Sequence, residues 1–276
     1  MSQANALPIL GVCLPIGRLP EYRDWILESQ RDVELQDFVK AEVLDAGDVR
    51  ALAAEAKSAL AGHTGRLGLH GPFWGFTIAS QDAEVRKVVR RRMDQGLDAC
   101  AATGATQMVI HSPYTTWMHN NLDMKPGARD EVTALAQDTL APVVARADAL
   151  GVTLVIENIE DKDPMDRVNL ARSFGSKAVK VSVDTGHAHY AHGSTGAPPV
   201  DYYIRLAAEM LDHVHVQDAD GYADRHWVPG EGSIRWPAVF AALAALDHSP
   251  RLMLELRDVT RLREGAGHLA RAGLAR

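Results

Sequence analysis

The sequence predicts one α/β domain, a (β/α)8 TIM barrel that spans residues 1–276. Eight short runs rich in Val, Ile and Leu recur along the chain, and amphipathic segments with helical spacing lie between most of them. A chain of 276 residues is too long for one small domain but has the length of a single barrel. An open doubly wound sheet is the alternative, but no glycine-rich phosphate-binding sequence follows the first run.

The eight runs are mostly continuous in their apolar character, which favours strands buried on both faces of a parallel sheet. Their lengths are those of strands rather than of helices. In chain order they are ILGVCL (9–14), VELQDF (33–38), RLGLHG (66–71), QMVIHS (107–112), TLVIEN (153–158), KVSVDT (180–185), DHVHVQ (212–217) and LMLELR (252–257).

The two longest intervening segments are typical of helices. QDAEVRKVVRRRMDQGLDACAATG (81–104) begins near Asp82 and ends at Gly104, and both residue types favour helix ends. PGARDEVTALAQDTLAPVVARADALG (126–151) repeats the design, and Pro142 is expected to kink or split it. Further helical patterns are LPEYRDWILESQ (19–30), GDVRALAAEAKSALAG (47–62), DYYIRLAAEML (201–211) and RWPAVFAALAAL (235–246).

The composition favours a cytoplasmic globular protein with no membrane association. Hydrophobic residues make up 46% of the chain and charged residues 24%, which is an ordinary globular balance. The net charge of -7 argues against nucleic acid as a partner, and the basic run RKVVRRR (86–92) falls on a predicted outer helix. No signal peptide and no window of about 20 apolar residues is present. Cys13 and Cys100 lie far apart, as in a reduced compartment.

Residues that can bind metal or transfer protons gather at one end of the predicted barrel. The active site of such a barrel lies at the C-terminal ends of the strands. Six consecutive strand candidates, from the third to the eighth, place carboxylates or imidazoles there or in the following loop. These residues are His70, His111, Glu157, Asp184, His187, His215, Asp224, His226 and Glu255.

The buried carboxylates of this cluster need compensation. Glu157 lies in the apolar run TLVIEN, where an unpaired carboxylate would be costly. Arg257 can pair with one carboxylate but not with the whole cluster. A divalent ion would satisfy all of them, and mixed carboxylate and imidazole ligands suit Mn, Mg, Co or Zn. The sequence therefore predicts a metal cofactor held by Glu157, Asp184, His215 and Glu255.

Five strings in the chain resemble those of the xylose isomerase-like TIM barrels. They are HGPF, IHSP, IEN, VDTGHA and HVQDADG…DRHWVPGEG, and the resemblance runs from about Ile9 to Asp258. The superfamily includes sugar isomerases and epimerases, inosose and dehydroshikimate dehydratases, and the related endonuclease IV class of DNA-repair enzymes. Because several branches share these strings, the resemblance implies fold and metal more specifically than it implies the reaction.

The sugar phosphate isomerase and epimerase branch implies a metal-dependent enzyme of carbohydrate metabolism. In its epimerases one metal is held by Glu, Asp, His and Glu, which match the four predicted ligands. The resemblance makes Glu157 and Glu255 the catalytic pair that removes and returns a proton through an enediolate, and it assigns a substrate oxygen to His187. The substrate would be a sugar, a sugar phosphate or a cyclitol.

Aromatic and basic residues near the predicted mouth are the candidates for substrate binding. Phe73, Trp74, Trp117 and Trp227 can pack on the C–H face of a sugar ring. Familiar epimerases also bind a ketose hydroxyl with an Arg in the loop after the seventh strand. Arg225 lies in roughly that loop, but it is flanked by two candidate ligands, and this is a departure from the epimerase pattern.

The endonuclease IV class is the main alternative. Its members bind three zinc ions with five His, two Glu and two Asp, and act as phosphodiesterases on abasic DNA. The chain has a candidate for every position, because His70, His111, His187, Asp224 and His226 add to the four predicted ligands. A metal-dependent dehydratase of the inosose or dehydroshikimate type is the second alternative. No basic loop adjoins the mouth, so a small sugar-like substrate is the expected partner.

Three features stay outside this assignment. His189 and His192 have no counterpart in the resemblance and are expected to be ordinary loop histidines. The segment 112–127 is a candidate lid over the mouth. A homo-oligomer paired through outer helices is compatible with the sequence, which identifies no surface for it.

Overall fold

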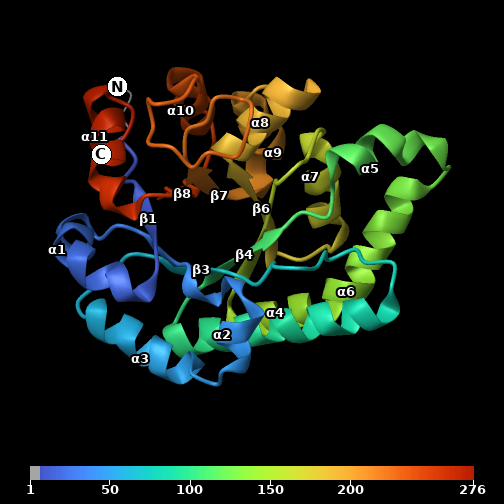
Figure 1. The fold of residues 1–276 in the computed structure, drawn as a ribbon, viewed down its shortest axis with the longest axis horizontal. Coiled ribbons are helices and arrows are strands. Elements are labelled where there is room, and N and C mark those ends of the chain that lie inside the picture. Colours follow the sequence, from blue (N-terminus) through green and yellow to red (C-terminus); the bar gives the residue numbers. More distant parts are fainter. Residues whose placement is uncertain (1–6) are drawn as a thin grey trace.

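Eight parallel strands close into a barrel in the computed structural model, which describes residues 7–276 (Figure 1). Each strand pairs with its neighbours in chain order, and β1 closes the ring against β8. The strands are β1 (Gly11–Leu14), β2 (Val33–Leu35), β3 (Leu67–His70), β4 (Gln107–His111), β5 (Thr153–Glu157), β6 (Val179–Asp184), β7 (Leu211–Val216) and β8 (Arg251–Leu254). Every strand overlaps its predicted run, and the (β/α)8 TIM barrel is confirmed.

Helices surround the barrel and connect the strands (Figure 1). They are α1 (Leu19–Ser29), α2 (Ala41–Asp45), α3 (Val49–Ala59), α4 (Ala83–Thr103), α5 (Thr116–Asn121), α6 (Ala128–Leu150), α7 (Pro164–Ser173), α8 (Thr185–Thr195), α9 (Val200–Ala207), α10 (Trp236–Ala244) and α11 (Leu262–Arg271). Short 3-10 turns lie at Ile16–Arg18, Asp37–Val39, Leu122–Met124, Ala208–Met210 and Val259–Arg261. The predicted ends of α4 are confirmed, because the Asp82 side chain accepts a hydrogen bond from the Glu84 N–H and Gly104 adopts a left-handed conformation. Helix α6 is one helix through Pro142 and is not split there.

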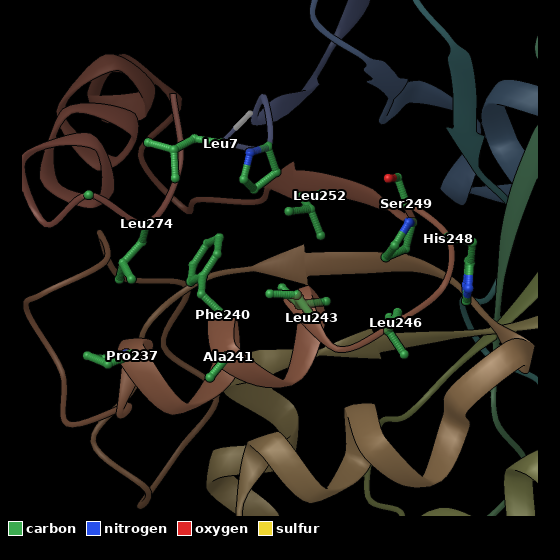
Figure 2. Close-up of a pocket in the computed structure, with 14 residues that line it drawn as sticks. Leu7, Pro237, Phe240, Ala241, Leu243, Leu246, His248, Ser249, Leu252 and Leu274 are labelled. Atoms are coloured by element: carbon green, nitrogen blue, oxygen red, sulfur yellow. The ribbon is translucent and has the colours of Figure 1, made fainter. Parts of the chain in front are cut away.

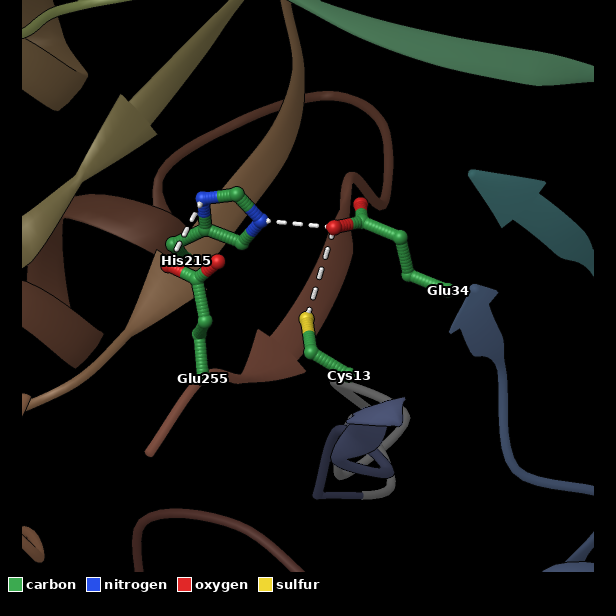
Figure 3. A group of neighbouring side chains, drawn as sticks. All are labelled: Cys13, Glu34, His215 and Glu255. Carbon is green, nitrogen blue, oxygen red and sulfur yellow. Dashed lines mark hydrogen bonds and ion pairs between the residues drawn. The ribbon is translucent and has the colours of Figure 1, made fainter. Parts of the chain in front are cut away.

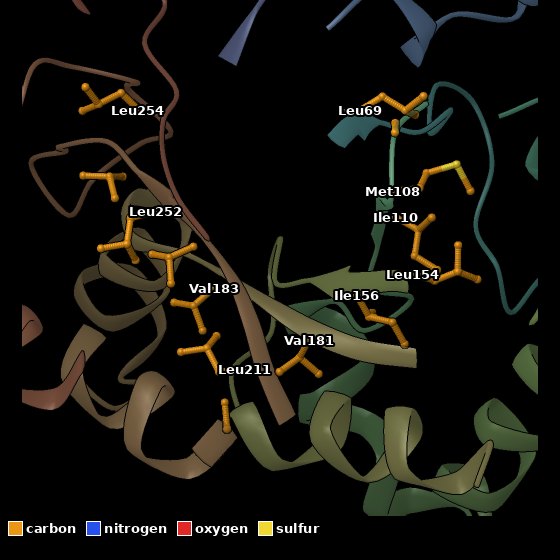
Figure 4. Packing of buried hydrophobic residues seen from close by; sticks show 14 of the residues in the cluster. Leu69, Met108, Ile110, Leu154, Ile156, Val181, Val183, Leu211, Leu252 and Leu254 are labelled. Carbon is orange, nitrogen blue, oxygen red and sulfur yellow. The ribbon is translucent and has the colours of Figure 1, made fainter. Parts of the chain in front are cut away.

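The strands have two chemically different faces. On β4 and β5, Met108, Ile110, Leu154 and Ile156 belong to the apolar core, and Figure 4 shows these side chains together with Val181 and others beside the neighbouring helices. The intervening residues on the same strands include the last residues of β4 and β5, which are predicted ligands. Because successive side chains of a strand point to opposite faces, the helices cover an apolar outer face and polar groups line the inside. Most of the inward-facing side chains are buried too, so the strands are buried on both faces, which is why their sequences are nearly continuous in apolar character.

Helix α8 begins directly after β6 and differs from the sequence prediction. The Asp184 side chain accepts a hydrogen bond from the His187 N–H at 2.7 Å and so caps the helix. His189 and His192 therefore lie on a helix, and their prediction as loop residues is wrong. His189 Nε2 lies 2.8 Å from Ser233 Oγ, and His192 Nδ1 lies 2.6 Å from the Ala197 carbonyl oxygen.

The candidate lid, 112–127, contains α5 and the turn Leu122–Met124. It lies beside the loop after β5, because Thr116 Oγ1 donates a hydrogen bond to the Glu160 carbonyl and Lys162 Nζ donates one to Asn120 Oδ1. Its role as a lid stays a prediction. Among the described helices, none is long and apolar enough to span a membrane.

An apolar hollow of about 520 Å³ lies on the outer wall beside α10 and β8 (Figure 2). Phe240, Leu243, Leu252 and Leu274 line it, and none of the predicted ligands does. The hollow is therefore separate from the cluster at the strand ends.

Candidate metal centre

The predicted ligands meet at one mouth of the barrel because their strands end together. His70, His111, Glu157 and Asp184 are the last residues of β3, β4, β5 and β6. The register pairs His111 with Glu157, and it pairs Asp184 with His215. The structure brings the nine candidates into three neighbouring groups, within each of which the ligand atoms lie within 4.8 Å of one another: Glu157, Asp184, His215 and Glu255; His70, His111 and Glu157; and His187, Asp224 and His226.

The central group is built around the imidazole of His215. Its Nδ1 lies 3.1 Å from Glu157 Oε1, 3.4 Å from Glu255 Oε2 and 3.9 Å from Asp184 Oδ2. His215, Glu157 and Asp184 are almost completely buried, and Glu255 is partly exposed toward the mouth. Three carboxylates thus face one imidazole nitrogen, which cannot balance their charge.

Two buried oxygens test whether a metal fits this group. Glu157 Oε2 and Asp184 Oδ2 are inaccessible to solvent and accept no hydrogen bond from any residue that the structure describes. An unpartnered buried carboxylate oxygen is costly, and a divalent cation is a common way of satisfying it. The donor set of carboxylate oxygens and one imidazole nitrogen also suits such an ion. The residues present therefore fit a divalent metal.

A second group lies on the β3 and β4 side. His70 Nε2 lies 3.5 Å from Glu157 Oε2, and His111 Nε2 lies 3.7 Å from the same oxygen. The Nδ1 atom of His70 is 3.0 Å from the Gly71 carbonyl oxygen, which orients this ring. Glu157 is thus shared by the central and the second group, one oxygen toward each.

A third group lies on the β6 and β7 side. His187 Nε2 and His226 Nε2 approach the same oxygen, Asp224 Oδ1, at 3.4 and 3.1 Å. His226 adopts a left-handed backbone conformation with φ of 50°, which is strained for a residue other than glycine. Such strain is maintained where the surroundings fix a side chain, and here it turns the ring toward Asp224 and Glu255.

Gln217, which directly follows β7, ties the central group to the third. Its Nε2 donates to Asp184 Oδ1 at 3.1 Å and lies 3.2 Å from Asp224 Oδ1, while its Oε1 accepts from the His226 N–H at 2.9 Å. A Cβ on Gly186 would clash with this amide, so only glycine at position 186 allows the approach.

The electrostatics of the centre are those of a densely charged, buried site. Burial would raise the pKa of Glu157, but His215, His187 and His70 outweigh it and hold that pKa well below its ordinary value. Burial raises the pKa of Asp184 to about 6, and the adjacent Glu157 adds to the rise. Burial lowers the pKa of His111 to about 3, so this imidazole is neutral at pH 7.

The protonated histidines predict that metal affinity increases with pH. Burial would lower the pKa of His226, but Asp224 and Glu255 outweigh it and raise that pKa to about 9; the pKa of His215 is likewise held well above its ordinary value by nearby carboxylates. An imidazole binds metal only after it loses its proton, so protons compete with the metal below these pKa values. We expect the affinity for Mn²⁺ to rise from pH 6 to pH 8.5, and calorimetry in two buffers of different ionisation enthalpy to show proton release. A pH-independent affinity without proton release would contradict this.

The predicted aromatic and basic substrate-binding residues lie in two sets, one in the segments after β3 and β4 and the other in the loop after β7. The Phe73 ring stacks on His111 at 3.9 Å and on Trp74 at 5.4 Å, and Trp74 is 60% exposed. Trp117 lies on α5 and is also exposed. The Phe73 and Trp74 rings lead from the second ligand group toward solvent.

Arg225 lies in the other set but is already engaged. Its guanidinium pairs with Asp220 at 2.8 Å and lies 5.2 Å over the Trp227 ring and 5.9 Å over the Tyr222 ring. Arg257 does not pair with Glu255 but donates to the Asp224 carbonyl oxygen at 3.3 Å. The basic side chains of Arg225 and Arg257 are thus already paired with residues of the loop after β7.

Sequence reasoning missed the polar residues beneath the centre. Glu34 on β2 lies 3.0 Å from His215 Nε2 and 2.9 Å from His213 Nε2, and all three are buried. The sequence does contain an indication of this residue, a carboxylate within an apolar run, because Glu34 lies between Val33 and Leu35 just as Glu157 lies in TLVIEN. Glu34 was overlooked because it lies in the middle of its predicted run and not at the end.

Comparisons with known proteins agree with this fold. The family model described as xylose isomerase-like TIM barrel matches residues 29–273. An uncharacterised protein of Methanocaldococcus jannaschii is 23% identical over 207 residues, covering 71% of this chain and 67% of its own. An uncharacterised protein of Mycobacterium leprae is 24% identical over 260 residues, covering 77% of this chain and 87% of its own.

Solved structures are similar over nearly the whole chain. A D-tagatose 3-epimerase-like protein has a TM-score of 0.74 at 19% identity and covers 95% of this chain and 96% of its own. A protein from Thermus thermophilus, solved after soaking with ZnCl2, has a TM-score of 0.66 at 25% identity and covers 94% and 98%. A family 2 AP endonuclease from Brucella melitensis has a TM-score of 0.69 at 16% identity and covers 96% and 99%. Because the family model matches most of the chain, the chain belongs to the xylose isomerase-like TIM barrel family.

Proposed function

We propose that the chain is a divalent-metal-dependent enzyme that isomerises or epimerises a small sugar-like substrate. Its metal ligands would be Glu157, Asp184, His215 and Glu255. The observation that carries the proposal is the pair of buried oxygens, Glu157 Oε2 and Asp184 Oδ2, that accept no hydrogen bond among residues 7–276. A bound divalent ion supplies Lewis acidity that polarises a carbonyl and stabilises the neighbouring negative charge.

The protein's own groups would move the proton. Glu157 ends β5 and Glu255 directly follows β8, and these strands are not neighbours in the barrel, so the two carboxylates approach the centre from different sides. One carboxylate can accept a proton from a substrate carbon while the other returns a proton to the opposite face. His187 Nε2 faces the mouth beside Asp224 and can donate a hydrogen bond to a substrate oxygen.

A sugar-like substrate is supported by the aromatic rings at the mouth. Phe73 stacks on His111, Trp74 and Trp117 are exposed, and the Arg225 guanidinium lies over the Trp227 ring. Ring faces beside polar groups suit the C–H face and the hydroxyls of a sugar. Similar solved structures include a D-psicose 3-epimerase and a 3-keto-D-glucoside 4-epimerase from E. coli. Sugar epimerisation is therefore the first chemistry to test.

The aromatic rim predicts a specific kinetic effect. Replacing Trp74 with Ala removes the exposed end of the stack formed with Phe73, where a sugar ring would pack. We take the packing of aromatic rings, about 0.5–1.5 kcal/mol, as the size of the contribution to the free energy of substrate binding. We expect KM to rise about 3- to 10-fold with kcat within about 2-fold, because the ring contacts substrate equally before and during the reaction. Tyr202→Ala is the matched control, since Tyr202 is a half-exposed aromatic residue on α9 at the outer wall. An unchanged KM in the Trp74 variant would exclude this contact.

A second candidate function rests on the other two ligand groups. His70 and His111 converge on one oxygen of Glu157, and His187 and His226 converge on one oxygen of Asp224. A four-ligand site does not use these pairs, whereas three neighbouring metal ions would use all nine residues, as in the endonuclease IV class. Phosphodiester hydrolysis is then the chemistry to test, and zinc is the metal suited to the imidazole-rich groups.

The experiment is a comparison of substrates on metal-loaded protein. Ketoses, ketose phosphates and inososes are incubated in D2O with Mn²⁺, Co²⁺ or Zn²⁺, and a duplex with one abasic site is incubated in parallel. Deuterium incorporation at the carbon that changes configuration supports the proposal, because a carboxylate that has removed a proton can exchange that proton for deuterium from the solvent. Loss of water from an inosose would identify the dehydratase alternative, and cleavage of the abasic strand without any deuterium incorporation would replace the proposal with the second candidate.

A further inference from the structure

A buried glutamate holds the side of the His215 ring that faces away from the predicted metal. Glu34 Oε1 lies 3.0 Å from His215 Nε2, and both side chains are almost completely inaccessible to solvent (Figure 3). The other ring nitrogen, Nδ1, faces Glu157 and Glu255. The two nitrogens of one imidazole thus face two different environments.

Several contacts fix the Glu34 carboxylate itself. Oε2 lies 2.9 Å from His213 Nε2, and Oε1 accepts hydrogen bonds from Gln36 Nε2 at 2.8 Å and from Cys13 Sγ at 3.5 Å. His213 Nδ1 lies 2.8 Å from Ser182 Oγ. The carboxylate therefore has little freedom to turn away from the ring.

Cys13, Glu34, His215 and Glu255 also lie close enough together to be considered a metal site of their own (Figure 3). The contacts argue against that role, because each oxygen of Glu34 lies within 3.0 Å of an imidazole nitrogen, Oε1 of His215 Nε2 and Oε2 of His213 Nε2. By contrast, Glu157 Oε2 and Asp184 Oδ2 accept no hydrogen bond from the described residues, and the imidazole nitrogens beside them lie at 3.5 Å or more. A cation is expected at buried oxygens without a close donor and not at those already in close contact with one.

We propose that Glu34 is the positioning residue of the metal centre, which accepts the Nε2–H of His215 and so presents the Nδ1 lone pair to the metal. A carboxylate in this place fixes the tautomer and the orientation of a ligating imidazole and strengthens it as a donor. The inference rests on the metal site of the proposed function. Gln36 extends the role to a second ligand, because its Nε2 also lies 3.3 Å from Glu255 Oε1.

The test compares two variants of similar volume. In Glu34→Gln an amide oxygen can still accept from Nε2–H, whereas Glu34→Met has no acceptor. Outer partners of metal ligands typically contribute 10- to 100-fold in affinity, so we expect the Kd for Mn²⁺ to rise about 10-fold in the first and about 100-fold in the second. The Kd is measured by competition with a chelator, and circular dichroism checks folding. If the Met variant does not fold, the increase in the Kd for Mn²⁺ in the Gln variant alone tests the inference.

Cys13→Ala is the matched control, because Cys13 is as buried as Glu34 and its contact, at 3.5 Å, is the longest of those that hold the Glu34 carboxylate. We expect its Kd to stay within about 3-fold of the original. Two results would overturn the inference. The first is an unchanged Kd in the Glu34 variants. The second is a Cys13 variant that loses as much affinity as the Met variant and, when loaded with Co²⁺, lacks a sulfur-to-metal charge-transfer band that the original protein shows. A chain that binds no metal even with Glu34 intact would instead refute the proposed function.

Discussion

Replacing Glu157 with Gln is expected to abolish binding of the proposed metal and to lower kcat about 1,000-fold or more. Glu157 belongs to both the central and the second ligand group, with Oε1 toward His215 and Oε2 toward His70 and His111. The amide keeps the shape of the side chain but replaces one oxygen by an NH2 group, which cannot bind a cation. Elemental analysis after dialysis measures the first effect, and turnover of whichever substrate the comparison above finds measures the second.

Glu160→Gln is the matched control, because it makes the same chemical change three residues later at an exposed position. It should keep the metal content and the activity of the original protein. A Glu157 variant that retains metal and full turnover would refute the assignment of this residue both as a ligand and as a catalytic group.

Replacing Arg167 with Met is expected to destabilise the fold by about 3–5 kcal/mol, the cost of breaking a buried ion pair from one side. Arg167 lies on α7, is fully buried, and its guanidinium lies 3.6 Å from the Asp161 carboxylate. It also donates to the Ile156 carbonyl oxygen at 3.0 Å and contacts the Ser182 carbonyl oxygen, at the ends of β5 and β6. The loss would leave Asp161 buried without a cation, and urea denaturation measures the free energy of unfolding.

Arg172→Met tests whether the effect comes from burial. Arg172 lies on the same helix, its side chain is 44% exposed, and it pairs with Glu209 at 2.7 Å. An exposed pair contributes about 0–1 kcal/mol, so this variant should unfold at nearly the original urea concentration. Equal destabilisation by the two variants would show that the buried pair has no special role.

The barrel was predictable because its local patterns agree with its topology. Each strand is a short apolar run between helical patterns, and Asp82 and Gly104 mark the ends of α4 in the sequence as they do in the structure. The rule that barrel enzymes use the C-terminal strand ends then identified the nine candidate ligands. Their proximity could be predicted from strand order alone, since β3 to β8 are consecutive neighbours.

Other features could not be read from the sequence. Helix α8 was missed because TGHAHYAHGST has three histidines and little apolar periodicity, and because Asp184 gives no sign in the sequence that it both ends β6 and caps a helix. The histidine partners of Glu34 come from β7, about 180 residues later, and only closure of the barrel brings them together. The division of nine ligands into three groups likewise depends on side-chain directions.

The most direct test of the account is the metal content of the chain, measured by elemental analysis on protein purified without chelator or nickel affinity resin. We expect a divalent ion at the group of Glu157, Asp184, His215 and Glu255, hence at least one Mn, Co, Mg or Zn per chain. Close to one ion would support the sugar isomerase proposal, and close to three zinc ions would favour the phosphodiesterase candidate. Protein that is active on its substrate, contains no divalent metal and does not respond to added metal would contradict the account.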